Sequence, residues 1–152
     1  MGLFDKIKGI KNAVTGGAAD VAVEVGQADT EQPIPVRVTA RAKADFKINR
    51  VYLLIRAHEE ALVRDVDIER DGRVSSETVR GEYETCKLEI EVAGSQELQE
   101  GEEYTWECEV NLPGDANPSF SGETIRHLWS VQAGLDARGN DPDSGWVEFW
   151  ID

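Results

Sequence analysis

Hydrophobic residues fall at every second position over most of the chain, and that spacing is typical of β-strands. In the segment 20–25, for example, Val21, Val23 and Val25 alternate with charged or small residues. The clearest runs with this spacing are residues 20–25, 35–41, 48–60, 85–94, 104–113, 124–135 and 145–152. Segments rich in Gly, Pro, Asp and Asn separate them, among them "DGR" at residues 71–73, which is typical of turns. Clean alternation gives each sheet one dry and one wet face, as in antiparallel sheets.

Eight or nine such strands, with no helical period after residue 17, predict an all-β fold. We expect a single antiparallel, immunoglobulin-like β-sandwich domain over residues 18–152. Neither an internal repeat nor a boundary between two domains is visible in the sequence.

The first 17 residues show a different period. Leu3, Ile7, Ile10 and Val14 are spaced by three or four positions, which puts them on one face of an α-helix, and Phe4 widens that face. Gly16 and Gly17 supply a stop signal. The sequence therefore predicts a short amphipathic helix over residues 1–17, ahead of the sandwich.

The chain has 152 residues, of which 40% are hydrophobic and 30% charged, as expected for a globular protein. No apolar run reaches the roughly 20 residues of a membrane span, and lysines interrupt the N-terminal apolar residues, so no signal peptide is expected. We therefore expect a cytoplasmic protein.

A net charge of −14 argues against nucleic acid as a partner. Residues 1–14 carry three Lys and one Asp, a local +2, so the rest carries −16.

Neither a metal nor a cofactor is expected from the residue spacing. Cys86 and Cys108 have no CxxC spacing and lie on the apolar side of their runs, which predicts buried free thiols. His127 is expected to be a hydrogen-bonded histidine at the core or its rim, and His58 a surface histidine. The carboxylates Asp136, Asp141 and Asp143 crowd one segment, but a hairpin turn explains that composition better than calcium does.

No sequence motif for catalysis is present. The chain has no GxSxG, no Cys–His motif and no P-loop. The residues 64–72, "RDVDIERDG", alternate acidic and apolar side chains, which is typical of an exposed strand rather than a catalytic pair of carboxylates. We expect a protein that is not an enzyme.

The stretch 101–136, "GEEYTWECEVNLPGDANPSFSGETIRHLWSVQAGLD", resembles the arrestin-like families. Leu112-Pro113, Pro118-Ser119 and the run 125–136 carry the resemblance. The opening helix followed by "GGAADVAVEV" looks more specifically like the bacterial sporulation-control branch. The resemblance implies a sandwich that serves as a non-enzymatic adaptor with a protein partner, in a regulatory role such as sporulation control. Phe120, in the loop 111–122, is a candidate contact for that partner, with a crossover loop whose Phe packs into the core as the alternative.

Three roles for the N-terminal segment remain open. Its apolar residues Leu3, Phe4, Ile7, Ile10 and Val14 could pack on the sandwich or on a second copy, since relatives of this family usually have two sandwiches in tandem. They could also bind a foreign protein. The third role is peripheral attachment of the basic amphipathic helix 3–14 to an anionic membrane surface.

The substitution Ile7→Asp distinguishes these roles. We expect docking within the protein or its oligomer, so the variant should lose thermal stability or mass, because an apolar contact becomes a buried, unpaired charge. Light scattering and melting curves of the intact and variant proteins measure this, together with co-sedimentation on anionic liposomes. Pelleting of the intact protein alone, with equal masses, would instead identify a membrane anchor. A stable, monodisperse variant that no longer retains a protein from lysate would identify a foreign partner.

Overall fold

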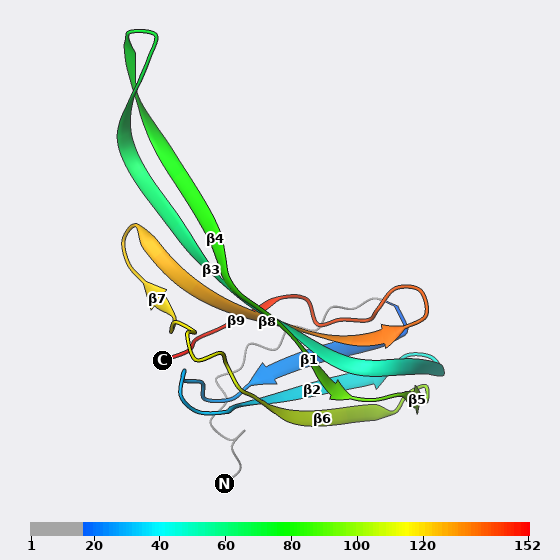
Figure 1. Cartoon of the computed structure of the whole chain (residues 1–152). Helices are drawn as coiled ribbons and strands as arrows, with labels where there is room; N and C mark the ends of the chain where they lie inside the picture. Colours follow the sequence, from blue (N-terminus) through cyan, green and yellow to red (C-terminus); the bar gives the residue numbers. More distant parts are fainter. Residues whose placement is uncertain (1–16) are drawn as a thin grey trace.

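The computed structural model describes residues 17–152, and the expected N-terminal helix lies outside that range. The described residues form nine strands and no helix (Figure 1). The strands are β1 (Ala19–Val25), β2 (Ile34–Ala42), β3 (Phe46–Arg70), β4 (Arg73–Ala93), β5 (Gln96–Leu98), β6 (Glu103–Val110), β7 (Phe120–Ser121), β8 (Ile125–Ala137) and β9 (Val147–Phe149). The prediction of an all-β, antiparallel fold is confirmed for this part of the chain.

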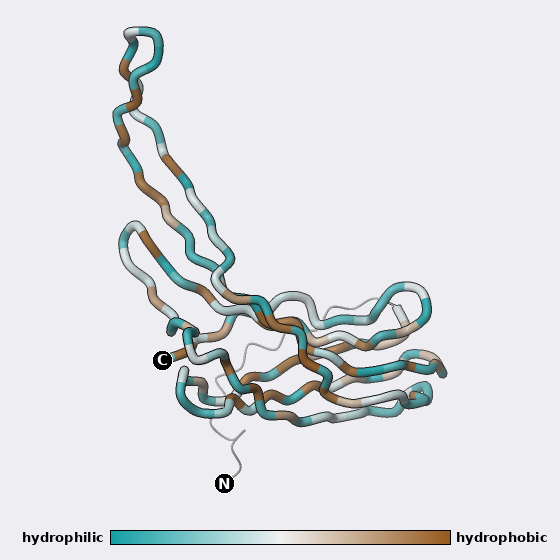
Figure 2. Tube along the Cα trace, viewed as in Figure 1, coloured by the Kyte–Doolittle hydropathy of each residue, from teal (hydrophilic) through white to brown (hydrophobic). Residues whose placement is uncertain are grey.

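The strands make two sheets that face each other across one core. The smaller sheet has the order β1-β2-β6, and the larger has the order β4-β3-β8-β7, with β5 beside β3 and β9 beside β8. Every pairing between named strands is antiparallel. The alternating apolar residues of both sheets fill the space between them, including Val21, Val38, Leu53, Trp129 and Leu135. Figure 2 shows the hydrophobic positions concentrated in this lower part of the molecule.

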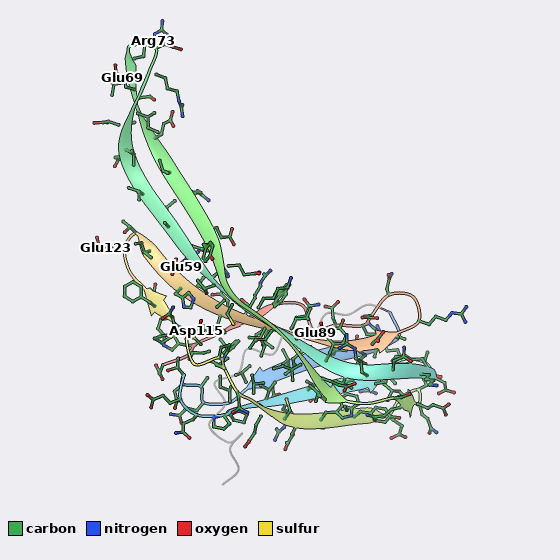
Figure 3. The ribbon with its side chains drawn as sticks, in the orientation of Figure 1. Glu59, Glu69, Arg73, Glu89, Asp115 and Glu123 are labelled. Atoms are coloured by element: carbon green, nitrogen blue, oxygen red, sulfur yellow. The ribbon has the colours of Figure 1, made fainter. Side chains whose placement is uncertain are left out.

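Strands β3 and β4 extend well beyond the sandwich as one long hairpin. Pairing of β3 with β8 ends at Ala61, and one further bond runs from the Leu62 amide to the Thr124 carbonyl. Past that point β3 pairs only with β4, up to Arg70 opposite Arg73. We call residues 62–80 the arm. It rises away from both sheets, with Glu69 and Arg73 at its tip (Figures 1 and 3).

The tip of the arm is a two-residue turn. Asp71 and Gly72 have φ angles of 51° and 76°, the left-handed values that a type I′ hairpin turn requires and that Asp-Gly readily adopts. The turn expected within "DGR" is therefore present. The sequence did not reveal how far the strands on either side of it continue: β3 has 25 residues and β4 has 21, against a mean strand of about 5–6.

His127 ties β8 to β4 and to the preceding loop, and it is only 6% exposed. Its Nδ1 lies 2.8 Å from the Pro118 carbonyl oxygen, and its Nε2 lies 2.6 Å from Thr85 Oγ1. Because a carbonyl oxygen can only accept, Nδ1 carries the hydrogen, and in the neutral ring Nε2 accepts from the Thr85 hydroxyl. Trp129 Nε1 also donates to this loop, at the Asn117 carbonyl. The expected hydrogen-bonded histidine at the rim of the core is confirmed.

Gly134 provides the space for the Tyr52 ring. A Cβ atom at Gly134 would lie 2.3 Å from Tyr52 Cζ and 2.4 Å from its hydroxyl oxygen. The ring is 8% exposed, and its hydroxyl donates to Asp141 Oδ2 at 2.9 Å. Asp141 also accepts from the Ala137 amide, so it fastens the 138–144 segment over the sheet. The acidic residues in this segment thus have structural partners, as a hairpin turn predicts.

Thr85→Val should lower the free energy of unfolding by about 1–3 kcal/mol, because it removes the donor to a buried histidine nitrogen. Urea denaturation measures the loss. Thr105→Val is the matched control: Thr105 is exposed on β6, so its change should stay within about 0.5 kcal/mol. Equal effects of the two substitutions would contradict a structural role for the Thr85–His127 bond.

Gly134→Ala should destabilise the protein by about 1–3 kcal/mol, since the new methyl group must displace the Tyr52 ring. Gly81→Ala is the control, because a Cβ there would meet only Ala61 Cβ, at 4.0 Å. That variant should be neutral or slightly more stable, through the reduced freedom of its unfolded chain. Thermal unfolding of the two proteins tests this, and a neutral Gly134→Ala would contradict it.

Candidate binding surface on the outer face of the larger sheet

The larger sheet carries polar and aromatic side chains on the face that points away from the core, which we call the outer face. On β3, Arg56 and His58 point outward because Ile55 and Ala57 point into the core. Along β8 the outward position next to Arg56 is Ser130. These strands and β9 line a hollow of about 360 Å³. Its lining residues are Arg56, His58, Glu60, Arg126, Leu128, Ser130, Trp146, Val147 and Glu148.

Two tryptophans lie next to the C-terminal strand, and one of them, Trp146, lines this hollow. Val147 and Ile151 are buried, so the positions in alternation with them, Trp146 and Trp150, point outward. Trp146 is 37% exposed and Trp150 53%. The Arg56 guanidinium stacks on the Trp146 ring at 3.9 Å from its centroid. Since Arg56 Nε is buried without a hydrogen-bond partner among the described residues, the aromatic ring is what this cation packs against.

A charged cluster lies beside the aromatic residues at the base of the arm. His58 Nε2 is 3.0 Å from Glu60 Oε1 and 4.0 Å from Glu82 Oε1. Arg126 binds the other oxygen of Glu60, Oε2, through both Nε and a terminal nitrogen. The hydrogen bond from Arg126 is the largest influence on Glu60 and holds its pKa below the usual value, with a smaller contribution from His58. His58 was expected to be a solvated surface histidine, but its side chain is only 14% exposed and its ring is engaged by carboxylates.

A second hollow, of about 640 Å³, lies where the arm separates from the β7–β8 turn, and it shares Glu60 and Arg126 with the first. Glu59 marks the base of the arm in Figure 3, and Glu123 marks that turn. Phe120 on β7 lies opposite His127 and is 54% exposed, so it is not part of the core. Its ring leans over Gly122, where a Cβ would come within 3.0 Å of it.

The apolar residues near Phe120 face the same way as the core but lie beyond the smaller sheet. Ile125 is 53% exposed and Tyr83 is 70% exposed. The inward positions of β3 at this level are Glu59 and Ala61, opposite Tyr83 and Gly81. The two-residue spacing within the run 124–135 predicts that Ile125 shares the inward face of His127. The predicted face of Ile125 is correct, but among the described residues no strand of the smaller sheet covers its side chain.

The two cysteines are free, as predicted, but half-buried rather than buried. Each packs against the edge of the core, and burial raises the pKa of both thiols. This correction has a simple cause: both thiols lie on edge strands, β4 and β6, where the two layers do not fully cover each other.

Other residues singled out in the sequence are distributed as follows. Leu3, Phe4, Ile7, Ile10 and Val14 lie outside the described residues. The carboxylates of the 136–145 segment bind separate partners: Asp143 accepts from the Gly145 amide, and Asp136 lies 3.7 Å from Arg50. The sequence interpretation missed Arg56, Trp146 and Trp150. The signal for the two tryptophans was present in the last run, "GWVEFWID", where they occupy positions that should be polar.

Within residues 17–152 there is no helix of the length and hydrophobicity needed to cross a bilayer.

Comparison with known proteins gives a match at the level of structure. No family model matches the chain, and no curated protein matches it. Among solved structures, the chain is similar to the crystal structure of Spo0M, a sporulation control protein from Bacillus subtilis, with a TM-score of 0.60 and 19% identity. The similar region covers 90% of this chain and 50% of the Spo0M chain, so this chain spans about half the length of that protein. The arrestin-like, sporulation-control-like resemblance found in the sequence is thereby confirmed as a resemblance of fold.

Proposed function

We propose that this protein is a non-enzymatic, regulatory binding module that recognises a protein partner through the outer face of its larger sheet. The observation that carries the proposal is the exposed pair Trp146 and Trp150 beside the stacked Arg56. Trp and Arg are the residue types that most often dominate the energy of protein interfaces. Each of the two tryptophans occupies a position where alternation calls for a polar residue.

The geometry suits an interface better than a small-ligand pocket. The outer-face hollow is shallow and is bordered by the Trp146 ring on one side and by the His58–Glu60–Arg126 cluster on the other. A protein partner could cover the rings while leaving the charged rim in contact with water, as typical interfaces do. A partner with a basic surface would also be attracted by the net charge of −14.

The regulatory part of the proposal draws on the fold. Spo0M, whose structure is similar, is described as a sporulation control protein. Because the similarity covers half of the Spo0M chain, a single sandwich of this type could pair with a second copy. Sheet edges offer a second route to assembly, since β4 forms one edge of the larger sheet and β1 one edge of the smaller. Phe120 and the N-terminal residues Leu3–Val14 remain candidate contacts.

The double substitution Trp146→Ala/Trp150→Ala tests the proposal. Immobilised intact protein should retain a specific protein from a lysate of the source organism, and the double variant should retain at least tenfold less, because two anchoring rings are lost. Quantitative mass spectrometry of the retained proteins measures this. Binding of the purified partner to both forms then confirms that the contact is direct.

Val74→Ala is the matched control, since Val74 is a 68% exposed apolar residue at the tip of the arm. It should retain the partner like the intact protein. Retention by the double variant at the intact level would overturn the role of the outer face.

The alternative is a membrane-associated protein attached through residues 3–14. It replaces the proposal if no protein is retained and the intact chain instead pellets with anionic liposomes. A mass above one chain in light scattering would identify a second copy as a partner.

A further inference from the structure

Three metal-binding side chains converge at the base of the arm, on the outer face of the larger sheet. They are His58 and Glu60 of β3 and Glu82 of β4. We propose that they form a binding site for a divalent transition-metal ion, of which Zn²⁺ is the best fit. This proposal goes beyond partner binding and does not depend on it.

The spacing of the ligand atoms fits one ion. Each residue offers one atom, and these atoms all lie within 4.8 Å of one another. The His58 nitrogen is 3.0 Å from the Glu60 oxygen and 4.0 Å from the Glu82 oxygen. Zinc holds nitrogen and oxygen ligands at about 2.0–2.2 Å, so shifts of less than about 1 Å, mostly of the exposed Glu82, would close the site.

The backbone already fixes the positions of these residues. His58 and Glu60 are two apart on one strand, so their side chains share a face. Glu82 lies directly opposite Glu60 in the β3–β4 ladder, and on the other side of Glu60 the β8 ladder places Arg126. Two neighbouring strands therefore hold β3 at this point, and the ligands start close to their final places.

Arg126 orients Glu60 for this role. It occupies Glu60 Oε2 and leaves Oε1 directed at His58. A charged group that holds one oxygen of a ligating carboxylate fixes the direction of the other, which is the usual task of the residues around metal ligands. Without Arg126 the Glu60 side chain would have more freedom to rotate away.

The charges at this place favour a cation. Glu60 and Glu82 form a directly opposed cross-strand pair of like charge, which is unfavourable in a sheet. Glu84, opposite His58, adds a third carboxylate, while Arg126 supplies one positive charge. A divalent ion between the two glutamates would convert the repulsion into attraction.

The set of donors indicates the kind of ion. One imidazole and two carboxylates suit Zn²⁺ and its neighbours in the first transition row. Calcium takes six to eight oxygen ligands, and magnesium rarely uses a histidine, so both fit poorly. The Glu82 side chain is 71% exposed and His58 only 14%, so water can reach the ion from the Glu82 side and complete its coordination.

Isothermal titration calorimetry with ZnCl₂ tests the proposal on the full chain. We expect saturable binding with one high-affinity ion per chain. Glu82→Gln and His58→Gln should each weaken that binding at least tenfold, because each removes one of three protein ligands. Zn²⁺ should also raise the melting temperature of the intact protein, and do so much less for either variant.

Glu109→Gln is the matched control. It removes the same charge from an exposed position of β6, in the smaller sheet, and Glu109 is not one of the three ligands. The affinity of this variant should stay within about twofold of the intact protein. The proposal is overturned if no saturable binding occurs, if His58→Gln and Glu82→Gln bind as the intact protein does, or if Glu109→Gln weakens binding as much as they do. Displacement of Zn²⁺ by a modest excess of Mg²⁺ would likewise show unspecific attraction by acidic residues.

Discussion

Hydrogen bonding along β3 is the constraint on which the rest of this structure depends. This one strand pairs with β4 and β5 on one side and with β8 on the other, and it runs on past the sandwich. Because successive side chains of a strand point to opposite faces, the register of β3 fixes what both faces of the larger sheet present. A slip by one residue would send Arg56 and His58 into the core and Ile55 and Ala57 into water.

The two faces of that sheet have different neighbours along their length. The inner face is covered by the smaller sheet as far as Ala57 and Trp129, and there it forms the core. Farther along, at Ala61 and Ile125, the cover ends and apolar side chains become exposed. The outer face instead combines the tryptophans near β9 with the ionic cluster at the base of the arm. The proposed ion site at the base of the arm thus lies where β3 and β4 extend past the layer that buries their inner face.

The two-residue spacing of hydrophobic positions and the residues typical of turns were sufficient to predict the all-β fold, the hairpin turn at Asp71-Gly72 and the hydrogen-bonded His127. They were not sufficient for features that depend on contacts between distant segments. Glu82 was not recognised as a neighbour of His58, because the 23 residues between them include a register shift between Val63 and Val66 that no local pattern specifies. The exposure of Ile125 was missed for a related reason: alternation identifies the face of a residue, but it does not show where the opposite sheet ends.

The long hairpin also has a consequence for the order of folding. Pairing of β2 with β6 joins Arg41 to Glu103, two residues far apart in the sequence. Once the β3–β4 hairpin has formed outward from its turn and β5 has paired with β3, Phe46 lies opposite Leu98. Only short connections then separate β2 and β6 from that pair. Each halving of the length of a loop lowers the free-energy cost of closing it by about 0.6 kcal/mol. Formation of the hairpin, which is local and fast, therefore lowers the cost of pairing β2 with β6, which is non-local and slow. The segment that projects farthest from the native core is therefore the one that brings the two ends of that core together.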